Sequence, residues 1–212
     1  MNHKLYLSIA PGIRHITITE MNQNFPLTIA FITERLAGYR RRAIENSPFT
    51  RSAVLMPLVK RENEFDLLFT KRSETVEHHK GQISFPGGAA DRADKSATDT
   101  ALRESFEEIG LPASAVQIIG AMDDLQTPSK FVVTPIVGVV EHLPPLQLNK
   151  KEVAEVFFIP LERFFDQSLR RSEFRERDGI RREVFSYDVW DEPVWGATAY
   201  FVHQFIGLLQ EG

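Results

Sequence analysis

The chain has 212 residues, of which 42% are hydrophobic and 25% are charged, a balance typical of one large globular domain and not of disordered, collagen-like or fibrous proteins. The 29 acidic residues outnumber the 25 lysines and arginines, and the net charge of -4 argues against sequence-independent binding to nucleic acid or to an anionic membrane surface. There are no cysteines, so disulfides, thiol nucleophiles and thiolate zinc sites are excluded.

No apolar stretch in the chain is long enough to cross a membrane. The longest, residues 53–59 and 131–140, fall well short of the roughly 20 residues that a membrane helix needs. Residues 1–10 carry one lysine and a short apolar run before Pro11, which is too little for an export signal. We therefore expect a cytoplasmic protein without a membrane partner.

Residues 1–48 are expected to form an N-terminal extension and a helical arm. Within residues 28–44 apolar side chains recur with the period of one helix face, and the arginines at 40–42 close the segment, where cations suit the negative end of a helix. Ser47-Pro48 should stop this helix. Residues 49–212 then form the main domain.

Short apolar runs bounded by charges and turns predict the strands of this domain. The runs are residues 53–59, 65–69, 82–85, 116–122, 131–140 and 155–159. Helices are predicted at residues 98–109, 161–168 and 197–209. Residues 173–187 alternate about an Asp178-Gly179 turn, which predicts a hairpin. The class is therefore α+β.

Three further features are expected to be structural. Asp123 and Asp124 precede a turn at residues 126–129 that explains them. Arginines and acids alternate over residues 170–183, so we expect ion pairs across the hairpin in preference to a site for a 3'-phosphate or an RNA strand. Trp195 is expected to pack beneath the last helix.

The predicted helix at residues 98–109 carries the strongest chemical signal. Glu104, Glu107 and Glu108 are spaced i, i+3 and i+4, which gathers their carboxylates on one side of the helix. Like charges at this spacing repel by roughly a few tenths of a kcal/mol per pair, a cost that a divalent cation would reverse. Magnesium prefers such oxygen ligands, so the spacing indicates a metal site.

The rest of this segment supports a site. Leu102, Phe106 and Ile109 should form the buried face of the helix, and Gly110 should end it. Residues 85–88 place a strand end and two glycines just before the helix, where backbone can approach a ligand. The alternative, a solvated glutamate-rich helix face, stays open for the helix taken alone.

Residues 88–111 resemble the Nudix hydrolase box, usually Gly-x5-Glu-x7-Arg-Glu-U-x-Glu-Glu-x-Gly-U with U aliphatic. In this chain Asp94 stands where glutamate is usual, and eight residues instead of seven separate it from Arg103. Ser105 replaces the aliphatic residue. These departures resemble the subgroup of coenzyme A pyrophosphatases.

Segments outside the box resemble the same subgroup. They are residues 67–73, 79–88, 133–135 and 195–199, in that order, so the resemblance covers about residues 50–210. Glu77 stands where this subgroup often has arginine.

The resemblance implies an α/β/α sandwich with a mixed sheet and a Mg²⁺- or Mn²⁺-dependent pyrophosphohydrolase. Its substrate would be a small nucleoside diphosphate conjugate, with coenzyme A or an acyl derivative cleaved to 3',5'-ADP and 4'-phosphopantetheine. ADP-ribose or another conjugate is the rival substrate, and a non-catalytic nucleotide-sensing module is the rival of another class. The sequence leaves open whether the chain forms a homodimer.

The resemblance also implies roles for residues of the box. Glu104, Glu107 and Glu108 would hold the metal, with the Gly88 carbonyl as a further ligand. Glu104 would be the ligand closest to the attacking water. Arg103 would orient a neighbouring carboxylate.

Residues outside the box complete the expected site. Arg72, Gly87 and Lys80 are expected to contact the substrate. Glu152 and Glu155, just before a predicted strand, are the candidates for the general base, and solvated acids at a strand edge are the alternative reading of both.

Overall fold

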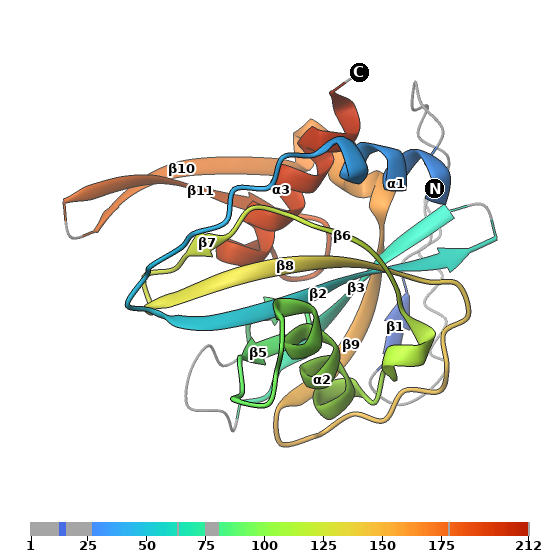
Figure 1. Cartoon of the computed structure of the whole chain (residues 1–212). Coiled ribbons are helices and arrows are strands. Elements are labelled where there is room, and N and C mark those ends of the chain that lie inside the picture. Colours follow the sequence, from blue (N-terminus) through green and yellow to red (C-terminus); the bar gives the residue numbers. More distant parts are fainter. Residues whose placement is uncertain (1–12, 16–26, 63, 75–80, 178, 212) are drawn as a thin grey trace.

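The structure is a computed structural model of the chain, and it describes residues 13–15, 27–62, 64–74, 81–177 and 179–211. Helices cover both faces of a central sheet, with α1 and α3 on one side and α2 on the other (Figure 1). The elements in chain order are β1 (Ile13–His15), α1 (Ile29–Gly38), β2 (Thr50–Arg61), β3 (Glu64–Arg72), β4 (Ile83–Ser84), β5 (Gly87–Ala89), α2 (Ala97–Ile109), the 3-10 helix η1 (Ala113–Ala115), β6 (Gln117–Ala121), β7 (Leu125–Gln126), β8 (Phe131–Val140), β9 (Val153–Pro160), the 3-10 helices η2 (Leu161–Phe165) and η3 (Gln167–Leu169), β10 (Arg170–Arg177), β11 (Ile180–Tyr187), β12 (Val194–Trp195) and α3 (Gly196–Gln210).

The central sheet is mixed. Its strands follow the order β1-β9-β3-β2-β8-β6, with β4 beside β3, β5 beside β2 and β7 beside β8. The β2–β8 and β1–β9 pairs are parallel, and the other pairs are antiparallel. A second sheet has the order β10-β11-β12. The predicted α+β class, with a mixed sheet between two layers of helices, is confirmed.

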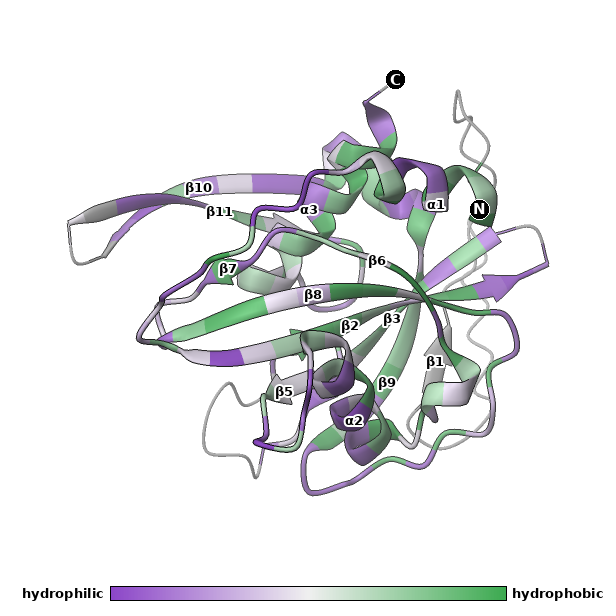
Figure 2. Cartoon of the chain, viewed as in Figure 1, coloured by the Kyte–Doolittle hydropathy of each residue, from purple (hydrophilic) through white to green (hydrophobic). Residues whose placement is uncertain are grey.

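Strand alternation divides the apolar core between the two faces of the sheet. Phe157 and Ile159 of β9 face α1 and α3, together with the buried side chains of those two helices. Val156 and Phe158 of the same strand face α2. The hydropathy colouring shows that the middle of the central sheet, between the helices on its two faces, is largely apolar (Figure 2). No helix of the described residues is long and apolar enough to span a membrane.

Helix α1 is shorter than predicted. The Thr28 hydroxyl accepts the N–H of Phe31 at 3.1 Å and starts the helix, but the helix ends at Gly38, and Tyr39 is extended. The prediction of a helix to residue 44 is wrong because Arg41 and Arg42 bond to residues far along the chain, not to the end of α1.

The partners of these arginines are Asp123 and Asp124, whose carboxylates are buried. Arg41 Nη2 lies 2.5 Å from Asp124 Oδ1, and Arg42 Nε lies 2.6 Å from Asp123 Oδ2. Asp124 also accepts the Thr134 hydroxyl at 2.6 Å. We call Arg41, Arg42, Asp123 and Asp124 the aspartate clamp, because it fastens the chain after α1 to the segment between β6 and β7. The sequence analysis explained Asp123 and Asp124 by the turn at residues 126–129, but in the structure they bind Arg41 and Arg42.

Two more expectations needed correction in the C-terminal part. Residues 161–168 form η2 and η3 instead of one α-helix. Trp195 is 39% exposed, with the Arg175 guanidinium 5.9 Å from its ring centroid, so it does not lie beneath α3. The hairpin predicted at 173–187 is confirmed as β10 and β11. Ion pairs among its described side chains join Glu173 to Arg175 along one strand and Arg171 to Asp188.

Candidate active site

Helix α2 is fixed at both ends, of which the sequence predicted the C-terminal one at Gly110. The Ser96 hydroxyl accepts the N–H of Asp99 at its start. Gly110 takes a left-handed conformation with φ 71°, and its N–H donates to the carbonyl of Phe106. The carboxylates on this helix are therefore held at defined positions.

The buried face of α2 differs from the prediction. Phe106 is 59% exposed, whereas Ser105 and Glu108 are buried. Ser105 fits against the sheet because its side chain is small and its hydroxyl donates to the Ala101 carbonyl at 2.6 Å. Glu108 faces inward because its carboxylate accepts a hydrogen bond from the backbone N–H of Gly87, in the glycine loop.

The glycine loop is β5, which pairs with β2 so that Gly88 lies opposite Ala53 and Gly87 opposite Val54. Gly87 has φ +156°, and a Cβ at this position would collide with the Ala53 carbonyl. A Cβ on Gly88 would collide with the carboxylate of Glu104. The Glu104 carboxylate thus lies directly on the loop backbone, and the predicted order of strand, glycine loop and acidic helix forms one site.

Glu108 is the most deeply buried carboxyl group of the site, with only 3% of its surface exposed. The Gly87 N–H donates to its Oε2 at 3.1 Å, and Arg72 Nη1 lies 3.7 Å from its Oε1. Burial raises the pKa of Glu108 to about 8, although Gly87 and Arg72 favour the charged form. Burial thus favours the protonated form of this carboxyl group, and added positive charge would favour the charged form.

Arg103 joins the carboxylates around it. Its Nη1 lies 2.8 Å from Glu104 Oε1 and 3.1 Å from Glu107 Oε2. Its Nε and Nη2 donate to Asp94 at 3.1 and 2.9 Å, and Nη2 also donates to the Ala89 carbonyl at 2.9 Å. The Arg103 guanidinium holds the pKa of the Asp94 carboxyl well below its usual range.

Asp94 has a structural role that the sequence did not indicate. It anchors Arg103, and its Oδ2 also accepts the Thr100 hydroxyl at 2.9 Å and the Asp91 N–H at 2.9 Å. The one signal in the sequence was an acid at this position of the box, and it gave no indication of that acid's partners.

The donor atoms of this site fit a divalent cation. Glu104, Glu107 and Glu108 supply carboxylate oxygens and Gly88 a carbonyl oxygen, the hard ligands that Mg²⁺ and Mn²⁺ take. Glu104 and Glu107 both reach one nitrogen of Arg103, so they already converge on a single positive charge. Burial raises the pKa of Glu104, which added positive charge would offset. Within the described part of the chain, no three acidic or histidine side chains yet surround one point closely enough to hold a cation.

The two candidate general bases lie in different places. Glu155 lies opposite Lys71 and on the face of β9 that carries Phe157, which is the α3 side of the sheet. Glu152 lies near α2, since its N–H donates to the carbonyl of Asn149 at 2.9 Å and the Asn149 N–H donates to the carbonyl of Glu108. The structure therefore brings Glu152, and not Glu155, to the carboxylates of α2.

Asn149 positions Glu152. The Asn149 Nδ2 donates to Glu152 Oε1 at 2.8 Å, and the Asn149 N–H donates to the carbonyl of Glu108 at 2.9 Å. The same turn satisfies the carbonyl of Ile109 through the Gln147 N–H at 3.0 Å. The turn is thus attached to the C-terminal end of α2, whose last carbonyls need such partners.

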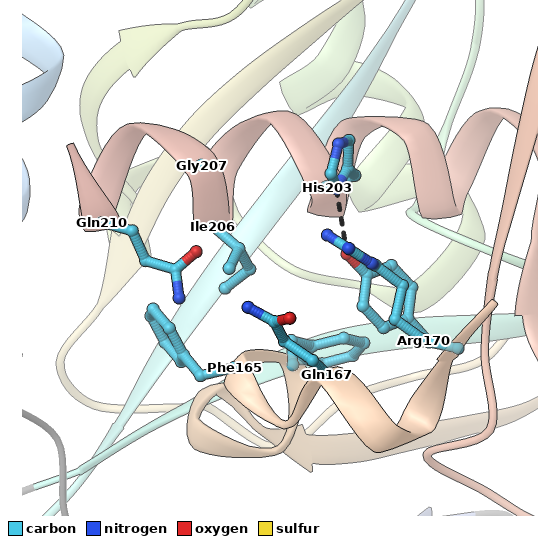
Figure 3. A pocket seen from close by; sticks show the side chains of 9 residues that line it. Phe165, Gln167, Arg170, His203, Ile206, Gly207 and Gln210 are labelled. Carbon is cyan, nitrogen blue, oxygen red and sulfur yellow. Dashed lines mark hydrogen bonds between the residues drawn. The ribbon is translucent and has the colours of Figure 1, made fainter. Parts of the chain in front are cut away.

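Of the expected substrate contacts, Gly87 and Arg72 are in the site and Lys80 lies outside the described residues, as does Glu77. Arg72 ends β3, and its buried Nε has no hydrogen-bond partner in the described structure. A small pocket also lies on the α3 side, lined by Phe165, Gln167, Arg170, His203, Ile206 and Gln210 among others (Figure 3). None of the predicted site residues lines that pocket.

Comparison with known proteins identifies the family. The model of the NUDIX domain matches residues 49–182. The chain belongs to the Nudix family. Nudix hydrolases cleave phosphoric anhydrides in nucleoside diphosphate conjugates and generally use divalent metals, so this Nudix protein is an enzyme of that kind.

Relatives of this Nudix hydrolase cover most of its length. A protein named uncharacterized Nudix hydrolase NudL from Photorhabdus laumondii is 35% identical over 189 residues, which are 89% of this chain and 96% of the relative. Its namesake from Pectobacterium atrosepticum is 39% identical over 154 residues, or 73% of this chain and 80% of the relative.

Among solved structures, the chain is similar to the NUDIX domain of Shewanella oneidensis NrtR complexed with ADP ribose. It is 19% identical with a TM-score of 0.44, covering 64% of this chain and 85% of that one. A MutT/nudix family protein from Enterococcus faecalis is 14% identical with a TM-score of 0.46, covering 86% of this chain and 67% of that one.

Proposed function

We propose that this Nudix hydrolase cleaves the diphosphate of coenzyme A or acyl-coenzyme A, giving 3',5'-ADP and 4'-phosphopantetheine or its acyl derivative. The observation that carries the chemistry is the contact of the Glu104 carboxylate with the Gly88 backbone, beside Glu107 and the buried Glu108. The choice of coenzyme A rests on the segments at residues 67–73, 79–88, 133–135 and 195–199. The expected compartment of the enzyme is the cytoplasm.

Glu104, Glu107, Glu108 and the Gly88 carbonyl are the proposed ligands of Mg²⁺ or Mn²⁺. When bound, the metal polarises the diphosphate and lowers the pKa of a coordinated water. Arg103 keeps Glu104 and Glu107 directed to the same point through its hydrogen bonds to both.

Arg72 is the proposed contact for the diphosphate of the substrate. Its guanidinium lies beside Glu108, and its buried Nε has no hydrogen-bond partner among the described residues. Phosphate oxygens would satisfy such a donor and balance its charge. The Gly87 backbone and Lys80 are the further proposed contacts.

Glu152 is the proposed general base. Asn149 binds its Oε1, which leaves Oε2 to accept the proton of the attacking water. The water oxygen then bonds to phosphorus while the bond to the bridging oxygen breaks, and the leaving phosphate takes that electron pair. Glu155 faces the other side of the sheet and is not needed for this step.

The test is mass-spectrometric detection of products after separate incubations with coenzyme A, acetyl-coenzyme A, ADP-ribose, NADH and diadenosine polyphosphates, each with Mg²⁺ or Mn²⁺. We expect 4'-phosphopantetheine to appear fastest. The Glu104→Gln variant is the control for a contaminating hydrolase.

Other outcomes separate the rival functions. Faster cleavage of ADP-ribose or a dinucleotide would retain the hydrolase and contradict the coenzyme A assignment, with Glu77 the first residue to exchange for arginine. Binding of nucleotide without cleavage of any substrate would instead support the sensing module.

A further inference from the structure

The hairpin of β10 and β11 projects from the body of the molecule, and one edge of it is open (Figure 1). β10 is the outer strand of the β10-β11-β12 sheet, and no strand in the described parts of the chain pairs with its other edge. Such an edge presents a row of backbone N–H and C=O groups to any strand that can align with it. β10 can therefore accept a partner strand.

An aromatic side chain lies in the middle of this edge strand. Phe174 is 61% exposed, and the Arg181 guanidinium lies 4.3 Å from its ring centroid. Phe174 lies opposite Glu183, so it shares a face of the hairpin with Phe185, which is buried against His203 of α3. The apolar face that α3 covers at Phe185 thus continues outward to an uncovered ring.

One exposed ring is ordinary on a protein surface, so the charges around it decide the argument. Glu173 and Arg175 flank Phe174; within one chain they pair with each other, and both side chains are largely exposed. In an antiparallel pair of identical strands with a two-fold axis at Phe174, each Glu173 faces Arg175 of the other copy. The two phenylalanines face each other between these ion pairs.

The other registers are less favourable. An axis at Ser172 would place Arg171 opposite Glu173, but it would place Phe174 opposite Arg170 and not opposite its own copy. An axis at Glu173 would place the two copies of this acid opposite each other, and an axis at Arg175 would do the same with two guanidinium groups. With the axis at Phe174, Ser172 faces Glu176, and Arg171 faces Arg177. The charge of Arg171 is already offset by Asp188, 2.5 Å away.

We propose that β10 pairs antiparallel with the β10 of a second copy of this chain, about a two-fold axis at Phe174. An isologous contact of this kind closes on itself, so it predicts a dimer and not a filament. The occupant is a second copy, because the pattern Glu173-Phe174-Arg175 is complementary to its own reverse. A nucleic acid would not be matched by the acids that alternate along this strand.

The first experiment measures the oligomeric state of the full chain by sedimentation from about 1 μM to about 1 mM, a range that brackets small interfaces. We expect a dimer that dissociates on dilution. Glu173→Arg and Arg175→Glu should each weaken it at least about tenfold, since like charges then face each other. The double variant carrying both changes should restore it, because opposite charges again face each other.

The matched control is Glu34→Arg, which reverses an exposed charge on α1 and should leave the dissociation constant unchanged. A chain that stays monomeric over this range would overturn the proposal. A dimer that the single reversals leave intact, or that the double variant does not regain, would overturn this surface. Monomers whose hairpin variants lose affinity for a uridine oligonucleotide would favour RNA instead.

The second experiment uses the absence of cysteine from the chain. In Phe174→Cys the two new thiols lie opposite each other, at the Cα separation of about 4.5 to 5.5 Å that a disulfide accepts. In Ser172→Cys, on the same face, they lie four residues apart along the strands, or about 13 Å. Oxidation should crosslink the first variant and not the second, and equal crosslinking of both would contradict the register.

Discussion

At Gly88 the lack of a side chain decides where the Glu104 carboxylate can lie. A methyl group there would collide with that carboxylate, so Gly88→Ala is expected to displace it and to lower kcat on the order of 100-fold, with little change in Tm. Gly38→Ala is the control, because a Cβ at Gly38 meets nothing within 4 Å. Full activity of Gly88→Ala would show that the contact is not needed.

Glu104 itself can be tested with a change that preserves its shape. Glu104→Gln should keep the fold and nucleotide binding while lowering kcat by about two or more orders of magnitude, since a proposed metal ligand loses its charge. Circular dichroism and a binding titration with the product 3',5'-ADP provide the check that fold and nucleotide binding are kept. Unchanged turnover would remove Glu104 from the metal site.

At this scale the sequence predicted which acids occur on α2 but not how each one lies. Polar residues are assigned to solvent by pattern, so Phe106 was expected inside and Glu108 outside. Glu108 is inside because Gly87 supplies an N–H and Arg72 a charge, and both come from other elements. Contacts between elements of this kind leave no periodic trace in the helix sequence.

Among the elements, α3 carries a histidine whose burial predicts a pH effect. Burial, aided by the charge of Arg170, lowers the pKa of His203 below its ordinary 6.5. The unfolded chain then binds more protons than the folded one just below pH 6.5, so the free energy of unfolding should fall as the pH drops through that window. Urea unfolding of His203→Gln should show a weaker pH dependence, and at pH 8 the two proteins should differ only by a constant packing contribution.

The aspartate clamp makes a second element prediction. Asp124→Ala removes the acidic acceptor of Arg41 Nη2, of the Thr134 hydroxyl and of the Ile44 N–H, and should cost about 3 kcal/mol of unfolding free energy. Arg40→Ala, at the exposed neighbouring arginine, should change stability by less than about 0.5 kcal/mol. Equal effects of the two variants in chemical denaturation would contradict a structural role for the clamp.

Elements were predictable where local pattern and tertiary role agree. Apolar runs identified the long strands, and Gly110 identified the end of α2. The end of α1 was not predictable, because Arg41 and Arg42 bond to aspartates some eighty positions away. The segment at 161–168 was predicted as one helix, but it is too short for local propensity to choose between an α-helix and two 3-10 turns.

For the whole molecule, the division into an arm at residues 1–48 and a catalytic domain at 49–212 stays a prediction. Ile32 and Leu36 of α1 are buried in the core, and Arg35 donates to the Leu208 carbonyl at 3.0 and 2.9 Å. Deletion of residues 1–48 should therefore lower the unfolding free energy by several kcal/mol. A shortened chain with unchanged urea unfolding would show that the arm is separable.

The parallel pairing of β2 with β8 also governs when the site can form during synthesis. Thr50 lies opposite Phe131, and the glycine loop, α2 and β6 all lie between these strands in sequence. Closing so long a loop costs entropy, and long-range parallel pairs form slowly. A nascent chain that has left the ribosome only as far as Gly110 already contains all three glutamates of α2, yet β2 still lacks its central neighbour. Activity should therefore appear only after β8 has emerged.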